Sequence, residues 1–281
     1  MPEGDTIFRA ARTLHRALAG KPITSFGSVF PALNRINEDA PIPGRIIERI
    51  HATGKHLLMR FSGDLVLRTH MRMNGSWHIY RTGERWQRSR RDMRIVVATA
   101  DFVAVGFNIP VAEFLMEREV AKSPELRRLG PDLLAEEFDS GKVLANLRER
   151  SDSEIAEALL DQRVLAGLGN VYKSEILFIC RIDPFRHVRD LTDAELRSVV
   201  DESRRLLKLN VSEGLELMTT YGGLRRTTGS GHPRNRLWVY GRARLPCRRC
   251  GTPIRVRKQG RDARLTYFCD TCQSTDVAQG R

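Results

Sequence analysis

The sequence predicts an α+β protein of several domains: a leading helix, a β-sandwich, a helical segment and a small metal-bound hairpin. The periodicity of apolar residues and the spacing of the cysteines predict this order. Helical apolar spacing fills the first 20 residues, short alternating runs follow to about residue 107, and helical patterns return after residue 134. Two CxxC pairs stand near the C-terminus. At 281 residues, the chain is long enough for two medium domains and an appendage.

The first element is a helix over residues 3–19. Ile7, Ala11, Leu14 and Leu18 recur at helical spacing, and Gly20 then stops the pattern. Pro2 therefore stands just ahead of the first turn.

The second region, from residue 23 to about 107, alternates in the manner of strands. Runs such as "RIIERI", "HLLMRF", "DLVLRTH" and "DFVAVGF" are separated by Gly, Asp, Asn and Pro. Several short strands divided by turn residues favour a sandwich.

The third region is helical. Residues 151–154 and 192–195 match S/T-x-x-E, a capping box, and predict helices over 155–162 and 196–209. Between them, Gly167 and Gly169 break one helix, and another begins near Val171. A helix, a glycine-rich turn and a helix is a DNA-binding layout, and it is equally a common way to pack two helices.

Charge points to a polyanionic partner. The chain has 47 basic and 34 acidic residues, a net charge of +13. Residues 217–261 hold no Asp or Glu but carry 12 Lys and Arg, without the apolar periodicity of a membrane-binding helix. Nucleic-acid phosphate is the partner that this pattern favours. Within this stretch, residues 222–236 are predicted to form a mobile basic loop.

Four cysteines predict a metal site. Cys247, Cys250, Cys269 and Cys272 form C-x2-C-x18-C-x2-C, the spacing of a zinc ribbon. Four thiolates leave no position for water, so we expect one structural zinc ion that holds a hairpin too small to have a core. Cys180, inside an apolar run, is interpreted as a core thiol.

Six collinear motifs carry a family resemblance over nearly the whole chain. They are "MPEG" (1–4), "GKHLL" (54–58), "RLGPD" (128–132), "DQRVLAGLGNVYKSE" (161–175), "VYGR" (239–242) and "ARLTYFCDTCQ" (263–273). The chain resembles the formamidopyrimidine-DNA glycosylase and endonuclease VIII family. This resemblance implies a β-sandwich with a leading helix over 1–117, a helix-two-turn-helix domain over 118–240 and a zinc finger over 241–281. It also implies excision of oxidised bases from DNA followed by strand cleavage.

The resemblance assigns the catalytic residues. Pro2, exposed as the N-terminus once Met1 is removed, would be the nucleophile that forms a Schiff base with the sugar. Glu3 would protonate the deoxyribose ring oxygen. Lys55 would bind phosphate and donate a proton during β-elimination. Arg264 would clamp the phosphates that flank the lesion and assist δ-elimination, for which a guanidinium fork is suited.

The resemblance also implies residues that bind DNA. Asn170 and Arg128 would contact backbone phosphate, although an N-cap is the simpler role for Asn170. An enzyme that extrudes a nucleotide needs a wedge to fill the gap. The segment "THMRMNG" (69–75) supplies Arg72 and Met73, with Asn74 less certain, whereas core packing is the alternative for Met71 or Met73.

Two departures from the family pattern bear on the substrate. Members commonly begin "MPEGPE", whereas this chain has Asp5 and Thr6. The Arg-Arg-Phe-Gly turn of the purine-directed branch is absent, which favours the endonuclease VIII branch and oxidised pyrimidines.

These patterns lead to one function and leave two alternatives. We expect a monomeric, cytoplasmic, nucleoid-associated enzyme that acts on double-stranded DNA with an oxidised base or an abasic site and has no membrane partner. The alternatives are a lyase restricted to abasic sites and a non-enzymatic zinc-ribbon protein that binds nucleic acid.

Overall fold

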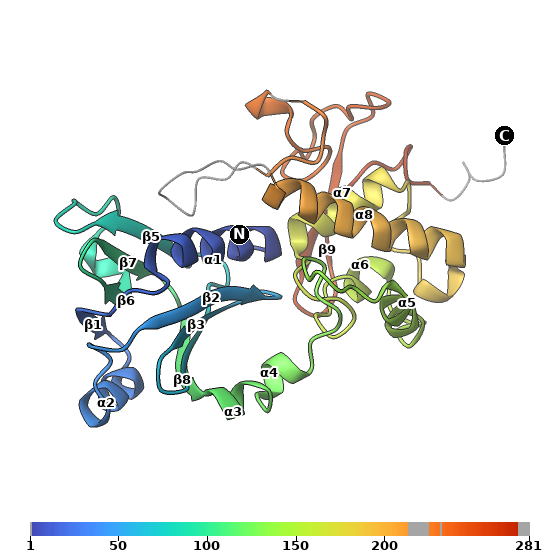
Figure 1. The fold of residues 1–281 in the computed structure, drawn as a ribbon. Coiled ribbons are helices and arrows are strands. Elements are labelled where there is room, and N and C mark those ends of the chain that lie inside the picture. The colour runs from blue at the N-terminus through green and yellow to red at the C-terminus, as the bar shows by residue number, and fades with distance from the viewer. Residues whose placement is uncertain (1, 213–224, 231, 275–281) are drawn as a thin grey trace. The chain divides into compact units, whose positions relative to one another are not determined.

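The computed structural model describes residues 2–212, 225–230 and 232–274. These residues form two compact units, one of residues 2–128 and one of residues 129–212 and 225–274 (Figure 1). The zinc-ligand cysteines belong to the second unit, as do the helices between residues 140 and 212. The division into three domains at 117 and 240 stays a prediction.

The leading helix is confirmed. Helix α1 (Gly4–Leu18) begins one residue after the predicted start and ends one residue before the predicted end. Ile7, Leu14 and Leu18 are buried against the sandwich. Gly20 follows with a φ of +77°, a left-handed conformation that glycine adopts without strain.

The sandwich is also confirmed. Two four-stranded antiparallel sheets have the orders β1-β6-β7-β5 and β2-β3-β4-β8 (Figure 1). Their strands are β1 (Ser25–Ser28), β2 (Ile47–Thr53), β3 (His56–Phe61), β4 (Leu65–His70), β5 (Ser76–Arg81), β6 (Met93–Ala98), β7 (Phe102–Phe107) and β8 (Val111–Met116). Side chains from both sheets and from α1 form one core, which includes Leu57, Phe61, Trp77 and Val97.

Short helices in the first unit were not predicted. Helix α2 (Pro31–Asp39) interrupts the segment that was predicted to be strands, and Leu33 anchors it in the core. Pro31 occupies its first turn, where the missing N–H costs nothing. Two further turns, α3 (Glu117–Val120) and α4 (Pro124–Arg127), follow β8.

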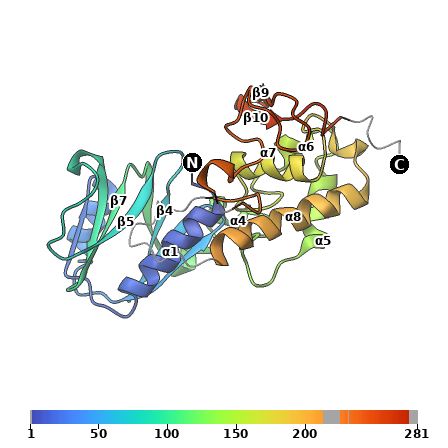
Figure 2. The same ribbon diagram turned by 90° about the horizontal axis from the view of Figure 1, so that it is seen from above.

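The second unit packs helices around a hydrophobic core and adds a two-stranded hairpin. Figure 2 shows these helices and the hairpin from above. The core includes Leu147, Tyr172, Ile176 and Leu206. The elements are α5 (Ser140–Arg148), α6 (Ile155–Ala158), α7 (Asn170–Ile179), α8 (Asp193–Ser212), β9 (Arg255–Gln259) and β10 (Arg264–Phe268). None of the helices in the described part of the chain is both long and apolar enough to cross a bilayer.

One of the two predicted capping boxes is present. The Thr192 hydroxyl accepts from the Glu195 amide at 3.2 Å, and the Glu195 carboxylate accepts from the Thr192 amide at 2.7 Å. The predicted capping box at 151–154 does not form, because the Glu154 carboxylate instead accepts from Gln259 on β9. Helix α6 ends at Ala158, four residues before the predicted end.

Candidate active site and nucleic-acid interface

The N-terminal pair is built into the start of α1. Pro2 and Glu3 are buried, and the Glu3 side chain has no exposed surface. The Glu3 carbonyl accepts from the amides of Thr6 and Ile7 at 2.9 and 3.0 Å, so Glu3 is the N-cap of the helix. These bonds fix the backbone that carries Pro2. The positive end of a 15-residue helix also lies at this point and favours negative charge nearby.

Asp5 and Thr6 replace the residues that the family commonly has. Asp5 is fully buried, and its carboxylate pairs with Arg9 one turn later at 3.5 Å. The Thr6 hydroxyl lies 3.4 Å from the same carboxylate. Burial beside a cation shows that Asp5 is more than a surface acid complementing the helix dipole.

Lys55 lies in a two-residue hairpin turn between β2 and β3. Gly54 precedes it with a φ of +56°, and the register pairs Thr53 with His56. The Lys55 side chain is half-buried. Lys55 therefore lies at the tip of a hairpin.

His70 lies beside this turn and was assigned no role from the sequence. The strand register pairs it with His56, and the two rings meet edge to face with centroids 4.8 Å apart. Burial first, then the charges of Lys55 and Arg72, lowers the pKa of His70 to about 4. Its Nδ1 accepts from the Arg72 amide at 3.0 Å, so at neutral pH the proton resides on Nε2. His70 thus offers a neutral N–H donor.

His56 lies on β3 opposite His70 and contacts Arg68 on β4. Burial, followed by His70 and Arg68, lowers the pKa of His56 to about 3. Arg68, only 4% exposed, donates through Nε to Glu113 on β8 at 2.5 Å. His56 and His70 are therefore both neutral at pH 7. Arg68, which contacts His56, forms an ion pair with Glu113.

The proposed wedge is a tight loop that follows β4. The Gly75 amide donates to the Met71 carbonyl at 2.9 Å, and a Cβ at position 75 would meet that carbonyl at 2.5 Å. Arg72 has a φ of +46°. Met73 is 51% exposed, whereas Met71 is 1% exposed, so the core alternative holds for Met71 and not for Met73.

A pocket of about 490 Å³ opens beside this loop. Its residues come from the loop, from β6 and from the segment between β7 and β8: Met71, Arg72, Met73, Asn74, Arg94, Asn108, Ile109 and Pro110. Its volume falls in the range of sites that hold small organic groups. Arg128, at the end of α4, is exposed and lies outside this set.

Asn170 and Arg264 come from neighbouring segments of the second unit. Asn170 is the first residue of α7, and its Nδ2 donates to the Leu265 carbonyl on β10 at 2.9 Å. The N-cap is Gly169, so the N-cap role for Asn170 is wrong. Lys173 reinforces the contact by donating to the Thr266 hydroxyl at 2.7 Å. Arg264 begins β10, and its side chain is 43% exposed.

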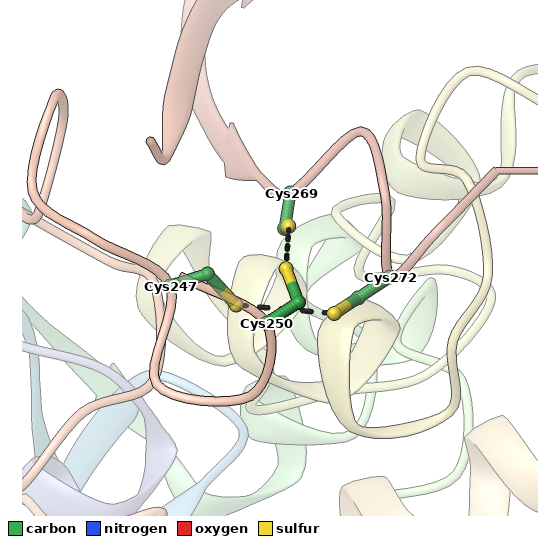
Figure 3. Close-up of side chains that lie close together, drawn as sticks. All are labelled: Cys247, Cys250, Cys269 and Cys272. Carbon is green, nitrogen blue, oxygen red and sulfur yellow. Dashed lines mark hydrogen bonds between the residues drawn. The ribbon is translucent and has the colours of Figure 1, made fainter. Parts of the chain in front are cut away.

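The four predicted cysteines converge (Figure 3). All four sulfur atoms lie within 4.8 Å of one another, with 3.9 Å between Cys247 and Cys272 and 3.5 Å between Cys250 and Cys269. Tetrahedral zinc with bonds of about 2.3 Å places its sulfur ligands roughly 3.8 Å apart. The donor set and spacing fit one structural zinc ion. Arg264 lies on the hairpin strand that runs directly into Cys269.

Cys180 belongs to the helical core and not to the metal site. It caps the C-terminus of α7, and its Sγ lies 3.7 Å from the Ser198 carbonyl. Burial raises the pKa of this thiol to about 11, which keeps it protonated.

The predicted basic loop lies partly outside the described residues. Its described residues are held by defined hydrogen bonds, including one from the Thr227 amide to the Arg236 carbonyl at 2.8 Å. The fully buried Glu175 on α7 anchors them, and no role was predicted for it. Its carboxylate accepts from the Thr227 hydroxyl and from the amides of the next segment: Trp238 at 2.7 Å, and Val239 and Tyr240 at 2.8 Å each.

Three family models match consecutive parts of the chain. They are the formamidopyrimidine-DNA glycosylase N-terminal domain over residues 1–108, its H2TH domain over 129–221 and the zinc finger found in FPG and IleRS over 244–275. Two relatives are similar over 98% of this chain. "Probable endonuclease 8 2" of Streptomyces coelicolor is 40% identical, with 94% of its length covered. "DNA-(apurinic or apyrimidinic site) lyase Nei2" of Mycolicibacterium smegmatis is 38% identical, with 99% covered.

More distant matches agree with these. "Endonuclease 8" of Escherichia coli O9:H4 is 31% identical, covering 97% of this chain and all of its own. Among solved structures, Lactococcus lactis Fpg in complex with an oxidised-pyrimidine-containing DNA has a TM-score of 0.82 at 24% identity. That match covers 98% of this chain and 100% of the other, and it shows the fold.

Proposed function

Because the chain belongs to the formamidopyrimidine-DNA glycosylase and endonuclease VIII family, we propose that it is a bifunctional DNA glycosylase and abasic-site lyase of base excision repair. In this proposal it removes oxidised bases, pyrimidines above all, and cuts the strand through a Schiff base on Pro2. The observation that carries the proposal is the burial of Pro2 and Glu3 together at the capped start of α1.

The first step is base release. Once Met1 is removed, the Pro2 nitrogen is a secondary amine that forms a bond to C1′ of the damaged nucleotide and loses its proton. The bond from C1′ to the base breaks, and the base leaves with the bonding electrons and takes up a proton. Glu3 donates a proton to the ring oxygen, which opens the sugar and leaves a cationic iminium between C1′ and Pro2. With Met1 retained, the same nitrogen is an amide and cannot react in this way.

Strand cleavage follows from the iminium. Loss of a C2′ proton expels the 3′ phosphate in β-elimination, and a second elimination expels the 5′ phosphate. The product is a one-nucleotide gap flanked by phosphates. Lys55 and the neutral Nε2–H of His70 would bind a phosphate of the damaged strand. Asn170, Arg264 and Arg128 would contribute further phosphate contacts.

Borohydride trapping tests the proposal. A duplex with an abasic site or thymine glycol should become covalently attached to the wild type and not to a Pro2→Ala protein. An abasic site already exists partly as an open aldehyde, so Glu3→Gln should abolish base excision and retain trapping on abasic DNA. Absence of any wild-type adduct would mean that the enzymatic proposal is wrong and would leave the non-enzymatic binder.

A second candidate is a lyase restricted to abasic sites. The name of the Mycolicibacterium smegmatis relative mentions only lyase activity, and this chain has Thr6 where the family commonly has another residue. Duplexes with thymine glycol, dihydrouracil, 8-oxoguanine or an abasic site separate the two. Incision of the abasic duplex alone would favour the restricted lyase.

The proposal extends to assembly and place of action. We expect a monomer that acts on chromosomal DNA in the cytoplasm. Sedimentation of the free protein and of its complex with one duplex measures this stoichiometry. A stable dimer in both would contradict it.

A further inference from the structure

The segment from the end of β5 to the start of β6 concentrates positive charge that the proposed reaction does not use. Residues 81–94, the arginine loop, contain six arginines but only two acids, Glu84 and Asp92. The arginines are Arg81, Arg85, Arg88, Arg90, Arg91 and Arg94. Arg81, Arg85, Arg90 and Arg91 are exposed. A surface that serves solubility alone mixes both signs.

The arginine loop is folded around Trp86. This ring stacks on Tyr80 of β5 with centroids 6.4 Å apart and meets Phe107 of β7 edge to face at 5.8 Å. The Arg90 guanidinium lies 5.3 Å from the centre of the same ring. These aromatic side chains form a small cluster of their own, separate from the main core of the sandwich. Trp86 therefore fixes the middle of the loop to the sheet.

Hydrogen bonds fix the backbone at further points. The Gln87 amide donates to the Tyr80 hydroxyl at 3.2 Å, and that hydroxyl is 3.1 Å from His78 Nδ1. At the start of the loop, the Glu84 carboxylate accepts from the Arg81 amide at 2.9 Å. The arginines thus project from an ordered backbone, which lowers the entropy cost of binding a partner.

The end of the arginine loop lies at the wedge pocket. The Asp92 carbonyl accepts from the Asn108 amide at 2.7 Å. Arg94 and Asn108 line the pocket of about 490 Å³ together with Arg72 and Met73. Loop and wedge are therefore adjacent parts of the first unit, and a duplex that receives the wedge would bring its backbone close to the arginines.

We propose that the arginine loop is a second DNA-binding surface, which contacts phosphates of the duplex within a few nucleotides of the base pair that the wedge enters. This inference rests on the proposed function, because that function places the wedge in DNA. Guanidinium groups match phosphate geometry and are weakly hydrated, which suits them to this contact. Each neutralised phosphate releases counterions, so the loop should make affinity more dependent on salt.

Salt dependence of binding tests the surface. The variant Arg85→Gln/Arg91→Gln removes two exposed charges and leaves Arg90 on Trp86. The binding partner is a duplex that carries tetrahydrofuran, a stable abasic analogue. Two lost phosphate contacts lower the slope of log affinity against log salt by about 1.8. The ratio of variant to wild-type Kd should then rise about twelvefold between 200 and 50 mM salt.

The matched control is Arg35→Gln/Arg118→Gln, which removes two exposed arginines from α2 and α3 of the same unit. Its slope should stay close to that of the wild type. An unchanged slope in the loop variant, or an equal fall in the control, would refute the surface. Borohydride trapping at saturating protein should be unaffected in both variants, so failure of the proposed chemistry is recognised separately by loss of wild-type trapping.

Neutral methylphosphonates, placed one at a time on both strands, locate the contact. A methylphosphonate at a position that the loop contacts should weaken binding by the wild type. It should not weaken binding by the loop variant any further. If every sensitive position is equally sensitive in both proteins, the proposed contact is excluded.

Trp86→Ala tests whether order in the loop matters. This change keeps all six arginines, so weaker binding with an unchanged salt slope is expected. Wild-type affinity in this variant would refute the role of the ordered backbone.

Discussion

Replacing Glu175 should destabilise the second unit in two graded steps. One carboxylate oxygen accepts from the amides of Val239 and Tyr240, and the other accepts from the Trp238 amide and the Thr227 hydroxyl. Burial raises the pKa of this carboxyl. Glutamine therefore mimics the protonated acid, and alanine removes both oxygens.

The two variants differ in how many donors they leave without an acceptor. In Glu175→Gln, the side-chain amide oxygen can still accept from the backbone amides of Val239 and Tyr240. The Thr227 hydroxyl can turn toward the Arg236 carbonyl, 3.2 Å away. Only the Trp238 amide then faces an NH2 group, at a cost of about 2 kcal/mol. Glu175→Ala leaves three amides without their acceptor, those of the buried Val239 and of the half-buried Trp238 and Tyr240. Relief of the buried charge offsets part of that loss, which leaves about 4 kcal/mol.

Urea unfolding of the zinc-loaded protein at pH 7 measures both values. The control is Glu154→Gln, because the half-buried Glu154 accepts from Gln259 and an amide oxygen can do the same. It should change the free energy of unfolding by less than about 0.5 kcal/mol. A loss below about 1 kcal/mol in Glu175→Ala, or equal losses in Gln and Ala, would refute the reasoning from orphaned donors.

Three other predictions concern the two methionines of the wedge loop, His78 and the metal site. Met71→Ala should cost about 2–5 kcal/mol in urea unfolding. Met73→Ala should cost less than about 0.5 kcal/mol of stability and should slow base excision about tenfold in single-turnover assays. Equal losses of stability in the two variants would contradict the assignment of Met71 to the core and of Met73 to the wedge. Burial first, then Arg88, lowers the pKa of His78 to about 4. The unfolded chain takes up this proton near pH 6.5 and the folded chain does not, so stability falls by up to ~1.4 kcal/mol per pH unit as pH drops from 6.5 to 4. In His78→Gln, the free energy of unfolding should fall less steeply between pH 6.5 and 4, as measured by urea unfolding at several pH values. An unchanged pH dependence would exclude His78 as a source of this loss of stability. Cys250→Ser should lose the stoichiometric zinc and most affinity for duplex DNA, and full retention of both would rule out the metal site.

Local pattern was sufficient for the large elements. Helix α1 follows from apolar periodicity because it buries one face, and the strands follow from short apolar or alternating runs divided by turn residues. The Thr192 box also followed from sequence, whereas the identical spacing at 151–154 did not form one. There the Glu154 carboxylate is occupied by Gln259, more than 100 residues away, and no local rule reports that competition.

The candidate site divides in the same way. The sequence determined which residue types are available: a proline and a glutamate before a helix, four cysteines at zinc-ligand spacing, and an excess of cations that favours a phosphate partner. Only the tertiary structure decided that Met71 is core and Met73 is exposed, that His70 lies beside Lys55, and that Glu175 holds three distant amides. The physical reason is that residue type and spacing are properties of a segment. Burial, strand register and hydrogen-bond partners arise only when segments far apart in the chain pack together.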